Sequence, residues 1–484
     1  MRISSTWPVT GHIDPDIQEN GRNENPRVGL SFSAIEALRD LRTQVQALWS
    51  KQGKNPHKQF VRNVTHQMEK VFKNDLRRED DLYVSMRSFL IFGQALGIVP
   101  IRGLGQKNCR VLHFRWCSWQ TFYNTAMTML LVLAAMLNLV VCFQVRGKNP
   151  SELAWSANMA VYYSIGAFNY QFFLRNTRRI IELFKTWQEV DLNFVGIDKN
   201  LFRDSVLISG CIYTFCIFEH AFSHLKFFPL VEVAERRLLS EPKVQGILKN
   251  ATAWETYYWR SHPFLPTIVP FSNFVAITFF LLSKFAIFAW DFGDILISVL
   301  SRALYYKFKL LIEQAETRLI RNRSTSLDSE KWIQLTDDHA KLYLLITEFE
   351  GLLSPLVFAS FGVNIYYLCL QLNLGLTPSA NNSLIASIYA TWSFMQLLVR
   401  LLAAAIPAAQ IHTYAHKMLQ VLKQCPTPCY TTEVDRTERF LAVTKIGLSG
   451  LGCFTITRPF ILSIVSVVFT FEIVLLQSTV VDTP

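Results

Sequence analysis

Long stretches without a charged residue constrain this chain more than any other feature of its sequence. Residues 119–145 and 153–174 contain no Asp, Glu, Lys or Arg, and neither do the 49 residues from Gly351 to Val399. A helix rises about 1.5 Å per residue, so roughly 20 apolar residues cross the ~30 Å hydrocarbon core of a membrane. Only 18% of all residues are charged, against about 25% in soluble domains. We therefore predict an all-α integral membrane protein rather than a soluble protein with buried core helices.

The same pattern predicts seven transmembrane helices, preceded by a segment at 1–87 and followed by a short tail at 478–484. The helices are expected at about 119–145, 153–174, 205–229, 267–300, 345–374, 384–411 and 446–477. The apolar stretch 88–101 is too short to span, so we predict a re-entrant or interfacial segment there.

The positive charges predict the orientation of these helices. Lys and Arg number 23 in segments 102–118, 175–204, 301–344 and 412–445, but only 7 in the alternating set of loops and the tail. Because cytoplasmic loops carry the excess of Lys and Arg, the amino terminus is predicted inside and the carboxyl terminus outside. The net charge of +11 then marks a cytoplasmic face, and no nucleic-acid partner is expected.

Charged residues inside the predicted helices are candidates for function, because burying a charge in a membrane is costly. These residues are Glu219, Lys284, Asp291, Asp294, Arg400, Arg458 and Glu472. Lys284 lies two turns before Asp291 and is positioned to neutralise it, so a purely structural ion pair is the alternative. Carboxylates beside aromatic rings suit a polyol ligand, although aromatic residues are also ordinary packing in helical bundles.

The last predicted helix differs from the others. Its Arg458–Pro459 step is expected to divide the helix into two pieces. The outer piece carries polar residues at 463, 466, 470, 472 and 477, which favours a position beside water. Four such helices around one axis would form a pore.

No nucleotide-binding loop, catalytic dyad or nucleophile motif is present, so the chain is not expected to be an enzyme and no cofactor is expected. His412, His416, Cys425 and Cys429 have the residue types of a zinc site, but the CPTPC segment at 425–429 is interpreted as a rigid loop. We expect no metal there. A receptor, a channel or both remain, with a non-conducting receptor or transporter as the rival class.

Several short segments resemble the insect gustatory receptors, and specifically their sugar-receptor branch. TFEIVLLQ at 470–477 resembles the family's carboxyl-terminal motif (Thr-Tyr, five residues, Gln-Phe), and GLSGLGCFTITR at 447–458 resembles the branch's Leu-Ser-Gly pattern. Further similarities, in the family's order, are SFLIFGQALGIVPIRGL (88–104), IFEH (217–220), WDFGDI (290–295) and LSPLVFASFGVNIYYLCLQL (353–372).

The resemblance implies a tetrameric, ligand-gated cation channel of the odorant-receptor-like fold. It implies a multi-pass protein in the plasma membrane of chemosensory neurons, forming homo- or heterotetramers with related receptors. Sugar would bind in the outer half of each helical bundle, and the last helix would line a shared pore. Segments 301–344 and 412–445 would form a cytoplasmic anchor. A receptor for bitter compounds or carbon dioxide is the alternative within the family.

The resemblance also implies candidate residues. Ligand-binding candidates are Glu219, His220, Trp290, Asp294, Asn364, Tyr366 and Trp392, and pore or gate candidates are Thr470, Glu472, Leu476 and Gln477. The chain departs from the family pattern at Phe471, which replaces Tyr, and at Ser478, which replaces the Phe near the pore's narrowest part. Gly452–Cys453–Phe454 replaces a Lys-Phe-Phe step, with loss of the positive charge.

Overall fold

The computed structural model describes residues 81–145, 150–190, 192, 194–195, 197–227, 252–321, 327–376 and 384–481. Within these ranges, the side chains at 145, 150–152, 226–227, 373–376, 384–386, 472 and 475–481 are not described. The chain divides into two compact units, Met1–Asp75 and Leu76–Pro484. The description below concerns the second unit.

This unit is built of long helices. They are α3 (Leu82–Ala95), α4 (Trp119–Val145), α5 (Pro150–Glu189), α6 (Leu201–Phe227), α9 (Ala253–Ser261), α10 (Asn273–Ala315), α12 (Ser329–Leu376), α13 (Leu384–Leu422), α14 (Thr432–Val443) and α15 (Arg458–Val481). Short helical turns lie at η1 (Cys109–Val111), η3 (Leu265–Thr267), η4 (Glu316–Ile320) and η5 (Thr427–Cys429), and strands β1 (Ser449–Gly450) and β2 (Phe454–Thr455) precede α15.

Each of the seven predicted spans overlaps a helix, but most of these helices are longer than a membrane requires. Among the described residues, five segments are long and apolar enough to cross a membrane: Trp119–Gln144, Leu201–Leu225, Asn273–Ile320, Ser329–Leu372 and Ser387–Leu422. The other two predicted spans lie in α5 and α15. The interfacial stretch predicted at 88–101 is helical up to Ala95, the end of α3, and then turns at Gly97, whose φ is 76°.

The prediction for residues 446–457 is wrong, because this stretch is not helical. Ser449 pairs with Thr455 and Gly450 with Phe454 in a small antiparallel hairpin. The hairpin turns through Leu451 and Gly452, with φ values of 51° and 70°, a conformation that glycine adopts without steric cost. Helix α15 then begins at Arg458, with Pro459 in the first turn, where its missing N–H breaks no hydrogen bond.

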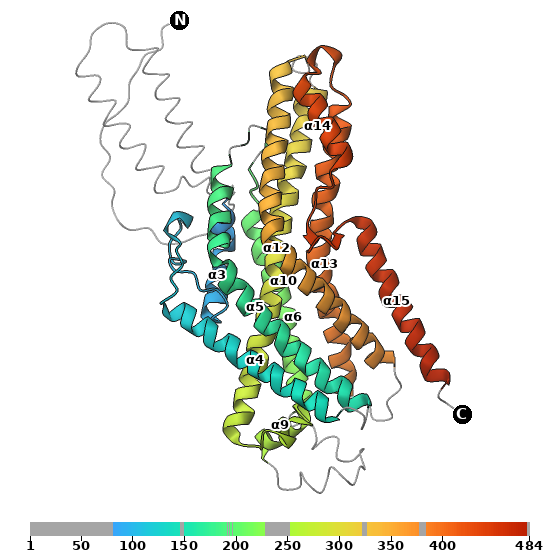
Figure 1. Cartoon of the computed structure of the whole chain (residues 1–484). Helices are drawn as coiled ribbons and strands as arrows, with labels where there is room; N and C mark the ends of the chain where they lie inside the picture. The colour runs from blue at the N-terminus through green and yellow to red at the C-terminus, as the bar shows by residue number, and fades with distance from the viewer. Residues whose placement is uncertain are drawn as a thin grey trace, which may run out of the picture. The chain divides into compact units, whose positions relative to one another are not determined.

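Helix α10 is the centre of the bundle and packs against α5, α6, α12 and α13 (Figure 1). A Cβ added at Gly166 of α5 would lie 2.9 Å from the Cα of Ala286, so small residues let the α5 and α10 backbones approach closely. The middle of α10 is buried almost continuously from Ala286 to Leu304. The charged residues of this stretch are therefore held inside protein.

Helix α15 contacts the bundle near its start and then diverges from it (Figure 1). It packs on α12 and α13, and the ring of Phe460 stacks on Phe454 of the hairpin at 4.6 Å between centroids. The ring centroid of Phe361 in α12 lies 6.0 Å from that of Phe460. The rings thereby join α12, the hairpin and the start of α15.

Candidate ligand-binding site

A cavity of about 170 Å³ lies among α5, α6, α10, α12 and α13, with residues of segment 257–262 on its wall. Its aromatic lining consists of Trp155, Tyr162, Tyr163, Tyr257, Trp290, Tyr367 and Tyr389. Polar side chains from all five helices also line the cavity. An aromatic cavity with a few convergent polar groups is typical of a small-molecule site.

One wall of the cavity presents a carboxylate held by hydrogen bonds. Gln371 of α12 donates its amide Nε2 to the hydroxyl of Ser393 at 3.1 Å, and Ser393 of α13 donates to Oε1 of Glu219 at 2.8 Å. These two hydrogen bonds fix the orientation of the Glu219 carboxylate. A carboxylate accepts several hydrogen bonds and donates none, so this wall is suited to ligand hydroxyl groups.

A second wall presents a cation and an imidazole. The ammonium Nζ of Lys284 donates to Nδ1 of His220 at 2.8 Å. Because a lysine ammonium can only donate, His220 is assigned the tautomer that carries its proton on Nε2. That Nε2 has no hydrogen-bond partner among the described residues.

The segment after α9 is tied to α5 by a buried relay. Ser261 donates to the carbonyl of Tyr257 at 2.7 Å and lies 2.8 Å from Nδ1 of His262, while the Tyr163 hydroxyl lies 2.9 Å from Nε2. Since the Ser261 proton is used, His262 donates from Nδ1 and accepts from Tyr163. Burial lowers the pKa of His262 to about 4, so the ring is neutral at physiological pH.

Several polar atoms of the lining have no hydrogen-bond partner among the described residues. These atoms are Nε1 of Trp155, Oδ1 of Asn158, Nε1 of Trp290 and both amide atoms of Gln396. Trp290 and Gln396 are only 3% and 2% exposed. Because buried polar groups are nearly always paired with protein or water, these atoms are available to hydrogen-bond water or a polar ligand in the cavity.

Behind the cavity lies a fully buried ion cluster. Arg400 of α13 contacts both Asp291 and Asp294 of α10, with Nε 3.2 Å from the Asp294 carboxylate. Its Nη2 donates to Asn364 at 2.7 Å, and the Asn364 amide donates to Asp294 at 3.0 Å. The hydroxyl of Ser360 also donates to Asp294.

This cluster corrects one expectation from the sequence. Asp291 is neutralised by Arg400, more than 100 residues away along the chain, and not by Lys284. The Arg400 guanidinium also lies over the Trp290 ring, 4.0 Å from its centroid. The cavity wall is therefore in direct contact with the ion cluster and, through Ser360 and Asn364, with α12.

The ligand-binding candidates from the sequence fall in three places. Glu219, His220 and Trp290 line the cavity, whereas Asp294 and Asn364 belong to the ion cluster. Tyr366 is 41% exposed and lies outside the lining. Trp392 is also outside it, donating its Nε1 to the carbonyl of Phe215 at 2.9 Å.

Sequence reasoning did not assign Lys284, Arg400, Tyr163, His262, Gln371 or Ser393 to the site. Lys284 and Arg400 are charges within predicted helices, and this signal could have placed them among the ligand-binding candidates. The hydroxyl and amide residues carry no comparable signal.

The pore candidates lie on α15, outside the cavity. Thr470 donates its hydroxyl to the carbonyl of Ser466 at 2.8 Å. Glu472, Leu476 and Gln477 are within the helix, but their side chains lie outside the described residues.

The two histidines among the four residues of zinc-ligand type have other contacts. Nδ1 of His412 lies 3.0 Å from the carbonyl of Ile446, and Nε2 of His416 lies 2.9 Å from that of Thr444. In the part of the chain that the structure describes, no three His, Cys, Asp or Glu side chains are grouped to hold a metal ion.

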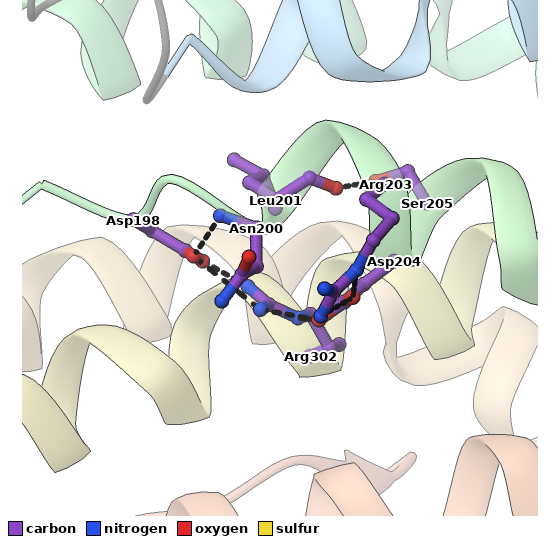
Figure 2. Close-up of polar contacts among 7 residues, drawn as sticks. All are labelled: Asp198, Asn200, Leu201, Arg203, Asp204, Ser205 and Arg302. Carbon is purple, nitrogen blue, oxygen red and sulfur yellow. Dashed lines mark hydrogen bonds and ion pairs between the residues drawn. The ribbon is translucent and has the colours of Figure 1, made fainter. Parts of the chain in front are cut away.

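A second ion cluster fastens the beginning of α6 to α10. Figure 2 shows Arg302 of α10 reaching both Asp198, in the loop before α6, and Asp204, in its first turn. Arg302 donates to Asp204 through Nε at 2.9 Å and Nη2 at 2.6 Å, and Asp198 accepts from the backbone N–H of Asn200 at 3.0 Å. Glu219 lies fifteen residues after Asp204, about 22 Å along α6.

Comparison with known proteins points to one family. Residues 63–482 match the family model described as "Trehalose receptor". The chain is similar to the Drosophila melanogaster protein "Gustatory receptor for sugar taste 64a", with 23% identity over 406 residues, covering 80% of this chain and 82% of that one. It is also 23% identical over 434 residues to "Gustatory receptor 5a for trehalose" of the same species, covering 87% and 92%.

The fold is similar to a solved structure. The insect olfactory receptor OR5 from Machilis hrabei aligns with a TM-score of 0.60 at 17% identity, covering 82% of this chain and 99% of that one. The structure of OR5 in complex with eugenol aligns with a TM-score of 0.56, also at 17% identity and with the same coverage. At this identity the similarity concerns the fold, which is that of an insect chemoreceptor.

Proposed function

Because this chain belongs to the trehalose receptor family, the sugar branch of the insect gustatory receptors, we propose that it is a cation channel opened by sugars. It is a multi-pass membrane protein and a receptor, not an enzyme. The observation that carries the proposal is the cavity, in which a carboxylate, a donor wall and aromatic rings meet. The Glu219 side would accept hydrogen bonds from sugar hydroxyls, and Trp155 or Trp290 would cover apolar sugar faces.

The contacts around α12 support a route from the cavity to α15. Trp290 and Arg400 line the cavity, and Arg400 bonds Asn364 of α12. Nearer the beginning of α12, the Ser354 hydroxyl accepts from the backbone N–H of Leu451 at 2.7 Å, and Glu350 accepts from the hydroxyl of Ser449 at 2.5 Å. A displacement of α12 on sugar binding would therefore move the hairpin that precedes α15. Sugar would favour the open state only as far as it binds that state more tightly.

The two faces of α15 support its role as the pore-lining helix. Ile461, Ile464 and Val468 pack against the bundle. Ser463, Ser466 and Thr470 repeat the same spacing two residues later, which places them about 200° around the helix. In the single chain, Thr470 and both serines are exposed. A line of hydroxyl groups opposite the packed face suits a helix beside water, and Gln477, seven residues after Thr470, continues the line by spacing.

The proposed arrangement in the membrane has seven spanning helices: α4, α5, α6, α10, α12, α13 and α15. The amino-terminal segment 1–87, together with 301–344 and 412–445, would be cytoplasmic, and the tail 478–484 would be outside. Segment 88–101 would lie at or re-enter the membrane surface. Four chains, identical or related, would surround one cation-conducting pore in the plasma membrane of chemosensory neurons.

Expression in an electrically silent cell tests the function. Sugars applied to the whole chain, alone and with co-expressed related receptors, should evoke a cation current that is absent from untransfected cells. A chain that reaches the surface yet gives no current with any sugar or partner would contradict the proposal. Currents evoked only by bitter compounds or carbon dioxide would replace sugar as the ligand class.

A further inference from the structure

The cation of the cavity, Lys284, has no carboxylate partner in the described part of the chain. Its Nζ contacts Nδ1 of His220 at 2.8 Å and lies 5.0 Å from the centroid of the Phe280 ring. No ion pair within 4.0 Å involves Lys284 among the described residues. Aromatic rings stabilise an ammonium group but do not neutralise it, and buried charges are normally paired.

The other cation of the cavity does not share this property. Arg400 contacts Asp291, Asp294 and Asn364, so its guanidinium is already neutralised from behind the wall. Glu219, whose Oε1 accepts from Ser393, is not within ion-pair distance of Lys284 in the described structure. Within the described residues, Lys284 is therefore the lining cation whose charge is available to a ligand.

His220 extends this donor site. With Nδ1 accepting from Lys284, the Nε2–H of His220 is a donor with no partner among the described residues. The two ring nitrogens of an imidazole point in different directions, so a carboxylate bound by the Lys284 ammonium leaves the Nε2–H of His220 to donate to another oxygen of the same molecule. Hydrogen bonds between charged partners are about twice as strong as neutral ones. Glu219, the next residue before His220 on α6, would accept hydroxyl hydrogen bonds from the remainder of the same molecule.

The cavity also limits the size of such a ligand. A volume of about 170 Å³ holds about a dozen water-sized atoms, because each water needs roughly 10–15 Å³ of such volume. That is the size of one pyranose ring with its substituents. We propose that Lys284 binds the carboxylate of a sugar acid, with His220 donating from Nε2 to another oxygen of the same molecule, so that monosaccharides carrying a carboxylate are ligands of this receptor.

The proposal rests on the cavity being the sugar site, and glucose and glucuronate form a matched pair of probes for it. They share one pyranose ring, and glucuronate carries a carboxylate where glucose carries a hydroxymethyl group. In the full-length receptor the half-maximal concentration should be at least about tenfold lower for glucuronate than for glucose. The ratio of the two half-maximal concentrations is the readout, because it is insensitive to surface expression.

Three variants separate charge recognition from folding. Lys284→Met should abolish the preference for glucuronate, whereas Lys284→Arg should retain part of it, because the positive charge remains. Lys309→Met removes a lysine of the same helix that pairs with Glu313 and should leave the ratio unchanged. A wild-type channel that responds to glucose but no better to glucuronate would overturn the inference and leave the proposed function standing.

A binding measurement tests the carboxylate site even if no sugar evokes a current. Trp155 and Trp290 line the cavity, so glucuronate should change the tryptophan fluorescence of purified wild-type receptor at concentrations at least about tenfold lower than for Lys284→Met. If no sugar opens the channel but this difference is found, gating by sugar fails and the carboxylate site stands. Equal fluorescence titrations for the two proteins would overturn the site.

Discussion

The carboxylate of Glu219 and the donors Lys284 and His220 give the cavity two chemically distinct groups of lining side chains. Glu219 is positioned through Ser393 and Gln371, and the donor wall consists of Lys284 and His220. A polyol has a donor and an acceptor in every hydroxyl group, so it can satisfy both walls at once. This polarity is a stronger argument for a hydroxylated ligand than the aromatic residues alone.

The first residue-scale prediction concerns Glu219→Gln. The amide keeps the size of the side chain but replaces one acceptor oxygen by a donor and removes the charge. Because hydrogen bonds to charged groups contribute about 1.5–3 kcal/mol, we expect half-maximal sugar concentrations to rise about tenfold or more. Current recordings with surface labelling measure this. Glu313→Gln, at an exposed glutamate of α10, is the control, and an unchanged response in Glu219→Gln would contradict the assigned role.

The second residue-scale prediction follows from His262, which is buried and neutral. Its pKa is about 4 in the folded protein and about 6.5 in an unfolded chain, so the unfolded state binds the additional proton between these values. Stability is therefore lost as pH falls below about 6.5, by about 2 kcal/mol at pH 5. The melting temperature of the purified protein should fall between pH 7.5 and pH 5, and less so in His262→Gln. An equal fall in both proteins would show that other groups cause it.

At the scale of elements, α6 is fixed to α10 at one end by ions and contributes to the cavity further along. The Asp198–Arg302–Asp204 cluster holds the beginning of α6 (Figure 2), whereas the cavity residues Glu219 and His220 lie about 22 Å away along the helix. None of the three ions lines the cavity, so the cluster is expected to stabilise the bundle from outside it.

The prediction for this cluster is a loss of stability in Arg302→Met. Removing the cation leaves the carboxylate of Asp198, which is 2% exposed, without its partner, and breaking such a pair costs about 3–5 kcal/mol. Arg203→Met is the matched control, because the Arg203 side chain is 66% exposed and pairs with the same Asp204. Exposed pairs contribute about 0–1 kcal/mol. Thermal unfolding should separate the two variants clearly, and equal melting temperatures would contradict the structural role of Arg302.

The elements also show what can be predicted from the sequence. Charge-free runs predict spanning helices because a charge facing lipid is costly, and this argument needs only the local sequence. The hairpin at 449–455 was mistaken for helix because its apolar composition resembles a span, although Gly450 and Gly452 mark a turn. The predicted pairing of Lys284 with Asp291 is wrong because the actual partner is distant along the chain. Spacing within one helix suggests Lys284, whereas the packing of α10 on α13 brings Arg400 to Asp291.

At the scale of the whole molecule, the proposed channel depends on the exposed face of α15. Its hydroxyl line faces away from the bundle that its own chain provides, so the single chain leaves this face exposed. Exposed apolar residues flank the line, among them Leu462, Val467 and Phe469 at 69%, 58% and 66%. In the proposed tetramer these residues would meet neighbouring chains or lipid, and the hydroxyl groups would face the ion path.

Cysteine substitution along α15 tests this arrangement. Thr470→Cys places a thiol on the hydroxyl line, whereas Val465→Cys places one about 130° away from the centre of that line, at a position that is 46% exposed in the single chain. A charged, membrane-impermeant thiol reagent applied outside during sugar activation should block the current of Thr470→Cys and leave that of Val465→Cys unchanged. The unsubstituted chain, whose Cys211 and Cys453 are exposed, sets the baseline. Block at position 465 but not at 470 would mean that the opposite face of α15 lines the pore, and the proposed packing of four chains would have to be rotated accordingly.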